Sequence, residues 1–247
     1  MKGGKETRLA VLRSQLAALE CSEKVPAVLP VGVPAIDGGL PWSGLPWSGL
    51  PLGALHEVTG AGAESEDGAV AAAFLAGILT RLSPDRPVLW CVGRSDLHVP
   101  GLAFYGLLPE RLILVRASGD REILWAMEEG LRSPALAAVV GEMTFLPAPA
   151  SRRLQLAAEL SGNTGFALCR GSTTAATSSA VTRWRVSTLP GSAAPGEPGI
   201  GRPRWRIELL RCRGGMTAIW EVEERDGEAG DATDHVPLPA VLADRPA

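Results

Sequence analysis

A glycine-rich turn between an expected strand and an expected helix is the first place where this sequence could do chemistry. The turn runs from Gly60 to Gly68, after a strand expected at 54–59 and before a helix expected at 69–82. This order is the setting of a P-loop, whose backbone N–H groups cradle phosphates at a helix N-terminus. Against the pattern GxxxxGK[ST], the turn lacks both the lysine and the hydroxyl. The positions of this degenerate loop are Gly60, Gly62, Ser65, Glu66, Asp67 and Gly68.

Acidic residues replace the groups that would hold a nucleotide in this turn. Glu66 stands where the lysine would balance the β- and γ-phosphates, and Asp67 stands where a hydroxyl would bind Mg²⁺. The Coulomb energy between two unit charges about 4 Å apart is about 4 kcal/mol at an effective dielectric constant of about 20. Replacing the lysine by an acid turns this energy from attraction to a phosphate into repulsion. The same acids suit the first turn of a helix, because the helix dipole favours negative charge there. We therefore expect them to cap the helix and to bind no nucleotide.

The other positions that a P-loop ATPase needs are also unfilled. The strand expected at 136–140 runs into Gly141 and Glu142, so the acid comes one residue late and falls on the opposite face. Asp96 is the nearest acid after the strand expected at 87–92. The motifs GxSxG and HExxH are absent, and the histidines and cysteines lack the spacing of metal ligands. We expect no enzyme activity, no cofactor and no metal, with the cysteines as reduced structural thiols.

Arginines gather in the last third of the chain. Two similar runs, Thr182-Arg-Trp-Arg185 and Pro203-Arg-Trp-Arg206, place a tryptophan between two arginines, which on a strand share one face. In one interpretation the tryptophans join the core and the arginines face water. In the other, the arginines contact a DNA backbone, weakly, or an acidic partner. The candidate residues are Arg183, Arg185, Arg204, Arg206, Arg211 and Arg213. The acids of 221–234 either solvate the tail or pair with these arginines and compete with DNA.

Four leucines near the N-terminus indicate a surface for packing. Residues 6–20 are predicted to form a helix with Leu9, Leu12, Leu16 and Leu19 in one stripe. A helix of this length is marginal alone in water, so the stripe must lie against its own domain or a second chain. An exact duplication, PWSGL at 41–45 and 46–50, is interpreted as an insertion in an exposed loop.

Apolar strands alternate with helices from residue 54 onward. Further helices are expected at 99–106, 120–132 and 150–160, and further strands at 112–116 and 165–169. This alternation predicts an α/β fold with a mostly parallel sheet covered on both faces. Antiparallel strands follow at 181–188, 204–211 and 216–224, with a linker at 190–203. We divide the chain into an N-terminal helix (1–25), a Gly/Pro-rich loop (26–53), the core (54–224) and an acidic, Pro-rich tail (225–247) that is expected to fray.

Length and composition limit the class of protein. The chain has 247 residues, of which 46% are hydrophobic and 21% charged, so it can build a core. The net charge of −3 excludes a protein that coats nucleic acid by bulk positive charge. No apolar run is long enough to cross a bilayer, and no signal peptide is evident, so we expect a cytoplasmic protein without a membrane partner.

The order of the motifs resembles the RecA-type ATPase core. The segments that resemble it are Ala35-Ile-Asp37, Gly49-Leu-Pro-Leu-Gly53 and Glu57-Val-Thr-Gly60, which lead into the degenerate loop. A RecA-like core without a working P-loop is similar to the ImuA family in particular. The runs that carry this resemblance are 41–56, Pro87-Val-Leu-Trp-Cys91, Pro100-Gly-Leu-Ala103, Ala126-Met-Glu-Glu-Gly-Leu131, 151–159, Ala180-Val-Thr-Arg-Trp-Arg185 and 205–213.

The resemblance to the ImuA family implies a DNA-damage-inducible, SOS-type accessory of a bacterial translesion-synthesis mutasome. Its implied partners are ImuB and a DnaE-type error-prone polymerase (ImuC), with RecA as a further partner. A RecA-like fold with an N-terminal amphipathic helix is implied as well. Since the residues offer no chemistry, we expect the leucine stripe and residues 181–224 to serve as binding surfaces. Two alternatives stay open: a SulA-type cell-division inhibitor, and a RecA paralogue with residual nucleotide or DNA binding.

Overall fold

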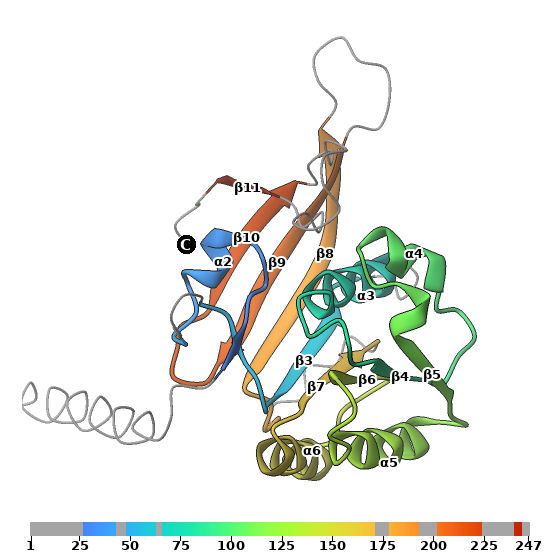
Figure 1. Ribbon diagram of the computed structural model, residues 1–247. Helices are drawn as coiled ribbons and strands as arrows, with labels where there is room; N and C mark the ends of the chain where they lie inside the picture. The colour runs from blue at the N-terminus through green and yellow to red at the C-terminus, as the bar shows by residue number, and fades with distance from the viewer. Residues whose placement is uncertain are drawn as a thin grey trace, which may run out of the picture.

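The computed structural model describes residues 27–42, 48–62, 66–170, 178–192, 202–223 and 240–243. The leucine stripe, the middle of the PWSGL duplication, the loop at 171–177 and most of the acidic tail lie outside these residues. Figure 1 shows an α/β fold in which helices cover both faces of a large twisted sheet.

The main sheet of the described residues has nine strands in the order β11-β10-β9-β8-β3-β7-β6-β4-β5. The six strands from β8 to β5 run parallel, and β9, β10 and β11 continue the sheet in antiparallel pairs. The strands are β3 (Leu55–Gly60), β4 (Val88–Val92), β5 (Leu112–Arg116), β6 (Ala138–Met143), β7 (Thr164–Cys169), β8 (Thr182–Ser192), β9 (Arg202–Cys212), β10 (Ala218–Glu223) and β11 (Ala240–Ala243). The mostly parallel, RecA-like α/β architecture predicted from the sequence is thereby confirmed.

Two pairs of helices cover the two faces of the parallel strands. Helices α3 and α4 lie on one face, and α5 and α6 lie on the other (Figure 1). Their bounds are α3 (Glu66–Leu79), α4 (Val99–Phe104), α5 (Asp120–Leu131) and α6 (Ala148–Ser161), with a short α2 (Pro34–Asp37) and a 3₁₀ turn, η1 (Pro109–Arg111). None of these helices combines the length and the apolar run that a bilayer crossing needs.

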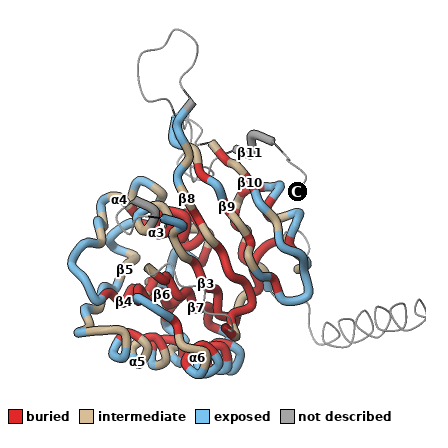
Figure 2. Tube along the Cα trace, turned by 180° about the vertical axis from the view of Figure 1, so that it is seen from behind, coloured by how far each residue is buried: buried red, intermediate tan, exposed pale blue. Residues whose placement is uncertain are grey.

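Each face of the sheet has its own hydrophobic core because side chains alternate along a strand. On the α3 face, Phe74 packs against Trp184, with ring centroids 5.9 Å apart, and Trp184 packs against Trp220 at 6.1 Å. On the α5/α6 face, Met127 and Leu154 belong to a second buried cluster. Figure 2 shows the central strands β3, β6 and β7 as the most buried part of the sheet.

The structure corrects three expected boundaries. Helix α3 begins at Glu66, three residues before the expected start. Gly68, the expected last residue of the preceding turn, lies within the first turn of the helix. The expected linker at 190–203 is shortened from both ends, since β8 runs to Ser192 and β9 starts at Arg202. The tail does not fray along its whole length, because β11 pairs with the edge of β10.

A short two-stranded sheet leads the chain into the core. Strand β1 (Val28–Leu29) pairs antiparallel with β2 (Leu50–Pro51). Asp37 accepts hydrogen bonds from the N–H groups of Val31 and Gly32 and so closes the turn between them. This arrangement fixes where residue 27, the first described residue, lies relative to the core.

Candidate functional site

The carboxyl ends of the parallel strands meet at one edge of the sheet. Open α/β sheets bind ligands outside this edge. Here β3 leads into the degenerate P-loop, β6 ends beside Glu142, and β7 is followed by Arg170. This edge is therefore the candidate site.

The degenerate P-loop is described in part. Gly60 is the last residue of β3, and the N–H of Ala61 donates to the carbonyl of Val186 on β8. Gly62 is exposed, Ser65 lies outside the described residues, and Gly68 lies in the first turn of α3. Glu66 and Asp67 open α3, the position where the helix dipole favours acids, and their side chains lie outside the description.

A buried carboxylate near the end of β6 is held by two donors of the chain itself. The indole N–H of Trp90 donates to Glu142 Oε1 at 2.7 Å, and Arg170 Nε donates to Glu142 Oε2 at 3.0 Å. Arg170 Nη2 makes a further, short bond to the same oxygen. Only 3% of Glu142 is exposed, so Trp90 and Arg170 take the place of water as the hydrogen-bond donors to this carboxylate.

The same guanidinium also binds Asp96, which follows β4. Arg170 Nη1 donates to Asp96 Oδ2 at 2.6 Å, and Nη2 donates to Oδ1 at 3.0 Å. These bonds lower the pKa of Asp96, and the two carboxylates together raise the pKa of Arg170 despite the opposing effect of burial. One arginine thus links the ends of β4, β6 and β7 in a charge-assisted network.

The face on which Glu142 lies corrects the expectation from the sequence. A side chain at Gly141 would meet Met127 on the α5 side, whereas Glu142 reaches Trp90, which belongs to the core on the α3 side. The acid therefore lies on the face of the helix that follows the degenerate P-loop. In place of a metal or a phosphate, its hydrogen-bond partners are Trp90 and Arg170.

The tryptophans of the arginine region lie in the core, and one arginine is buried with them. Trp184 and Trp205 are buried, as the structural interpretation requires. The same interpretation is wrong for Arg183, which does not face water but lies buried 3.2 Å from Glu57 on β3. Arg185 Nη2 donates to Glu208 Oε1 at 3.0 Å on the neighbouring strand.

The remaining four candidate arginines also have partners within the chain. Arg204 and Arg206 both reach Glu221 on β10, at 3.4 and 2.9 Å, so one acid of the expected acidic stretch pairs with the arginine face. Arg211 donates to the carbonyl of Ser178, and Arg213 donates to that of Ser179. Arg206, Arg211 and Arg213 are exposed. Contact with DNA or an acidic partner stays a prediction.

A second buried polar chain, missed at the level of sequence, crosses the central strands. The indole N–H of Trp184 donates to Thr182 Oγ1 at 2.7 Å, and that hydroxyl lies 2.8 Å from His56 Nδ1. His56 Nε2 donates to the carbonyl of Pro51 at 3.1 Å. Burial lowers the pKa of His56 to about 4. This histidine is neutral and structural at physiological pH.

The cysteines and acids show no arrangement for redox or metal chemistry in the described part of the chain. Cys91, Cys169 and Cys212 are buried free thiols, and burial raises the pKa of each of them. No group of three His, Cys, Asp or Glu side chains among the described residues is arranged to hold a metal ion. Sequence reasoning had noted Glu142 and Asp96 but missed Arg170, although its place directly after a strand was a usable signal.

The fold and this edge define a class of protein: a RecA-like α/β domain whose P-loop carries acids and whose edge carboxylates are bound by an arginine of the same chain. Two curated proteins are similar along almost the whole length. Protein ImuA of Caulobacter vibrioides strain NA1000 / CB15N and Protein ImuA of strain ATCC 19089 / CIP 103742 / CB 15 are each 40% identical over 238 residues, 92% of this chain and 95% of the relative. No family model matches the chain. The chain belongs to the ImuA family, as the resemblance of its motifs implied.

Proposed function

We propose that this protein is a non-catalytic accessory of a translesion-synthesis mutasome, in which it holds ImuB and a DnaE-type error-prone polymerase together after DNA damage. Membership in the ImuA family supports a role in damage-inducible mutagenesis. The observation that carries the non-catalytic part is the Arg170 network, because both edge carboxylates already bind a cation that the chain supplies.

Catalysis at this edge would require that network to open. A carboxylate that binds Mg²⁺ or activates water needs a free oxygen lone pair directed at its target. Glu142 gives one oxygen to Trp90 and the other to Arg170, and Asp96 gives both oxygens to Arg170. A metal ion would thus have to compete with Arg170 for these carboxylates, and with Glu66 at the lysine position of the loop the phosphates would lack the cation that balances them.

A protein without chemistry of its own must act through its surfaces, and one such surface lies at the end of the sheet. Strand β5 is the edge strand beside β4, and its residues Ile113 and Leu114 are 45% and 41% exposed. Phe104 and Leu108, which precede β5, are 65% and 51% exposed. Apolar side chains on an unpaired edge are typical of strands that pair with another protein. This edge supports a role in assembly, with a strand of a mutasome partner as the occupant.

Nucleotide binding separates this proposal from that of a residual RecA-type ATPase. We expect the melting temperature to be the same with and without Mg-ATP or Mg-ADP at millimolar concentration. A ligand at about 100 times its Kd would stabilise the folded protein by about 2.7 kcal/mol, which is a shift of a few degrees. The variant Arg170→Gln removes the cation of the network, and its melting temperature is measured with and without the same nucleotides. A saturable shift in the wild-type protein would refute the expectation that no nucleotide binds and would favour the alternative of a RecA paralogue with residual nucleotide binding.

The partners are tested by co-purification of the tagged protein from damage-treated cells. We expect ImuB and the DnaE-type polymerase in the wild-type eluate, with RecA as a further partner. The double variant Leu12→Asp/Leu16→Asp tests the leucine stripe, and Ile113→Lys tests the β5 edge. If both variants retain every partner of the wild-type protein, neither surface mediates assembly. Filamentation on overexpression with no change in mutation rate would instead favour the SulA-type alternative.

A further inference from the structure

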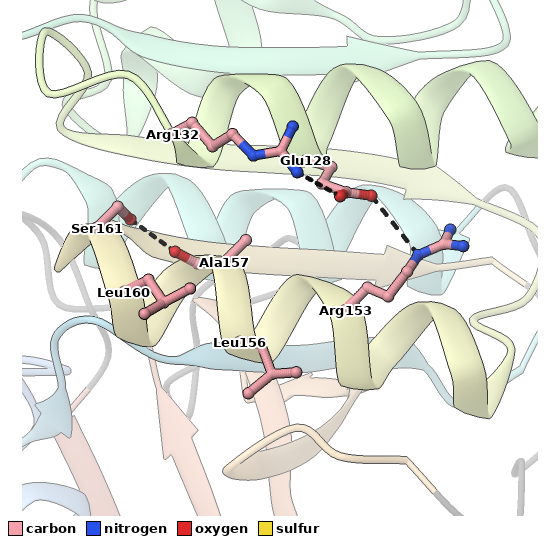
Figure 3. A pocket seen from close by; sticks show the side chains of 7 residues that line it. All are labelled: Glu128, Arg132, Arg153, Leu156, Ala157, Leu160 and Ser161. Atoms are coloured by element: carbon pink, nitrogen blue, oxygen red, sulfur yellow. Dashed lines mark hydrogen bonds and ion pairs between the residues drawn. The ribbon is translucent and has the colours of Figure 1, made fainter.

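A hollow of about 460 Å³ lies between α5 and α6 on the outer side of the molecule. Its lining residues come from both helices, as Figure 3 shows: Glu128, Arg132, Arg153, Leu156, Ala157, Leu160 and Ser161. The hollow shares no residue with the Arg170 network described above.

The uncovered part of the hollow is aliphatic. Leu156 and Leu160 are one turn apart on α6, so they lie on the same side of that helix. Leu156 is 46% exposed and Leu160 is 89% exposed, the largest value among the exposed large hydrophobic side chains of the described residues. Two neighbouring exposed leucines in a hollow indicate a surface that is covered in the functioning protein.

The polar groups of the hollow are already paired with one another. Arg132 Nη2 lies 2.7 Å from Glu128 Oε1, and Arg153 Nε lies 3.6 Å from Glu128 Oε2 (Figure 3). The contact of Arg153 joins α6 to α5, and Arg132 also pairs with Glu129 at 2.5 Å, so two acids balance the two arginines. The occupant that suits this surface is therefore an apolar one.

The start of the described chain lies beside the C-terminal end of α6. The carbonyl of Ala27 accepts a hydrogen bond from the N–H of Leu52 at 2.8 Å. The next residue, Gly53, donates to Thr164 Oγ1 at 3.2 Å and packs so closely on Gly162 that an added Cβ would lie 3.4 Å from its Cα. Gly162 directly follows α6. The N-terminal segment thus joins the core close to the turn that carries Leu160.

The N-terminal segment has the length and the apolar pattern to reach the hollow. Residues 20–26 span up to about 25 Å when extended. The distance from Leu156 to the end of α6 is about 8 Å at the rise of a helix, so the whole apolar surface lies within reach. The stripe Leu9, Leu12, Leu16 and Leu19 is about 15 Å long as a helix and needs an apolar surface to be stable.

We propose that the leucine stripe of residues 6–20 docks in the α5/α6 hollow of the same chain and covers Leu156 and Leu160. The free protein then keeps its leucine stripe shielded, and a partner that binds this stripe must displace it from the hollow. The inference goes beyond the proposed function and does not rest on it, because docking takes place with no partner present.

Hydrogen exchange of the full-length protein tests this docking. A helix of 15 residues that lies free in water exchanges its amides almost as fast as an unfolded chain. We expect the amides of residues 9–19 to exchange at least about tenfold more slowly than that in the wild-type protein. The double variant Leu156→Asp/Leu160→Asp should abolish this protection without lowering the melting temperature, because both side chains are partly or largely exposed.

The control variant is Met216→Asp, which places the same charge on another exposed apolar residue, 84% exposed in the turn between β9 and β10. It should leave the protection intact. Unprotected amides in the wild-type protein would overturn the proposal, and so would protection that survives the double variant. Protection that rises with protein concentration over a hundredfold range would assign the hollow to a second copy and overturn docking within one chain.

Discussion

The arginine at the carboxyl edge and the arginines of β9 are paired with acids in very different surroundings. Arg170 binds Glu142 and Asp96 at a position where its side chain is 16% exposed and that of Glu142 is 2% exposed. Arg206 binds Glu221 where the two side chains are 45% and 31% exposed. Both are ion pairs between neighbouring segments, but only Glu142 is shielded from water, since the other carboxylate that Arg170 binds, that of Asp96, is 50% exposed.

The difference in exposure determines what it costs to separate each ion pair. Separating a buried ion pair leaves a charge without solvent, whereas separating an exposed pair exchanges one solvated contact for another. At the carboxyl edge the carboxylate of Glu142 is therefore withdrawn from water, whereas the side chain of Asp96 is 50% exposed. The face of β9 is the region where an outside phosphate or acid could replace Glu221.

The largest expected effect comes from removing the buried cation. Arg170→Met should lower the free energy of unfolding by about 3–5 kcal/mol, because Glu142 is left as an uncompensated buried charge. Urea denaturation followed by circular dichroism measures this. The matched control is Arg213→Met, which removes an exposed arginine and should cost less than about 1 kcal/mol.

A double variant separates the lost charge pair from lost packing. Arg170→Met/Glu142→Gln should recover a large part of the stability lost in Arg170→Met, because a neutral amide tolerates burial better than a carboxylate. If the double variant is as unstable as the single one, the network holds the edge together by packing and not by charge.

The next effect in size is a dependence of the free energy of unfolding on pH, which originates at the buried His56. His56 titrates near pH 6.5 in the unfolded chain, whereas burial lowers its pKa to about 4 in the folded protein. The folded state then binds fewer protons, so the stabilisation is present above pH 6.5 and is lost as the pH falls from 6.5 to 4. The loss should approach about 3 kcal/mol.

Thermal unfolding between pH 7 and pH 4 measures this dependence, with His56→Gln as the comparison. The variant should be less stable at pH 7 and should have a flatter profile through that interval. An unchanged slope would mean that other groups dominate the acid lability of the protein.

The smallest effect on stability is expected at the exposed ion pair between Arg206 and Glu221. There we expect an effect on DNA binding instead. Glu221→Gln should change the free energy of unfolding by less than about 1 kcal/mol. It also removes the acid that Arg204 and Arg206 share, so a DNA duplex should bind more tightly, with a clear dependence on salt. Fluorescence anisotropy at two salt concentrations measures this. If neither protein binds DNA, the phosphate interpretation of these arginines fails.

Much of the fold followed from the sequence because its signals are local. The strand at 112–116 has the expected bounds, and the hairpin around Gly214 forms with that glycine at φ 77°. The limits of β8 and β9 did not follow, because Pro190 and Pro203 indicate a linker, whereas pairing between long neighbouring strands extends past both of them. Pairing with a distant strand outweighs such local signals.

The candidate site likewise has features that the sequence predicts and contacts that it does not predict. The acids at 66 and 67 and the absence of a P-loop lysine are properties of the sequence, and they already disfavour a nucleotide. The partners of Glu142 are not such a property, because Trp90 lies 52 positions from Glu142, and Arg170, which binds both acids, lies 74 positions from Asp96. Nothing in their spacing predicts that one guanidinium reaches both acids.

The sequence by itself determined the class of this protein: a parallel α/β domain of the ImuA family with a P-loop that lacks its cation. The tertiary structure fixes which charged side chains are buried and which are exposed. Alternation along a strand fixes only the face of a side chain, whereas its partner depends on which strands become neighbours in the sheet. In this chain β7, β6 and β4 are neighbours in the sheet, so Arg170 reaches both Glu142 and Asp96.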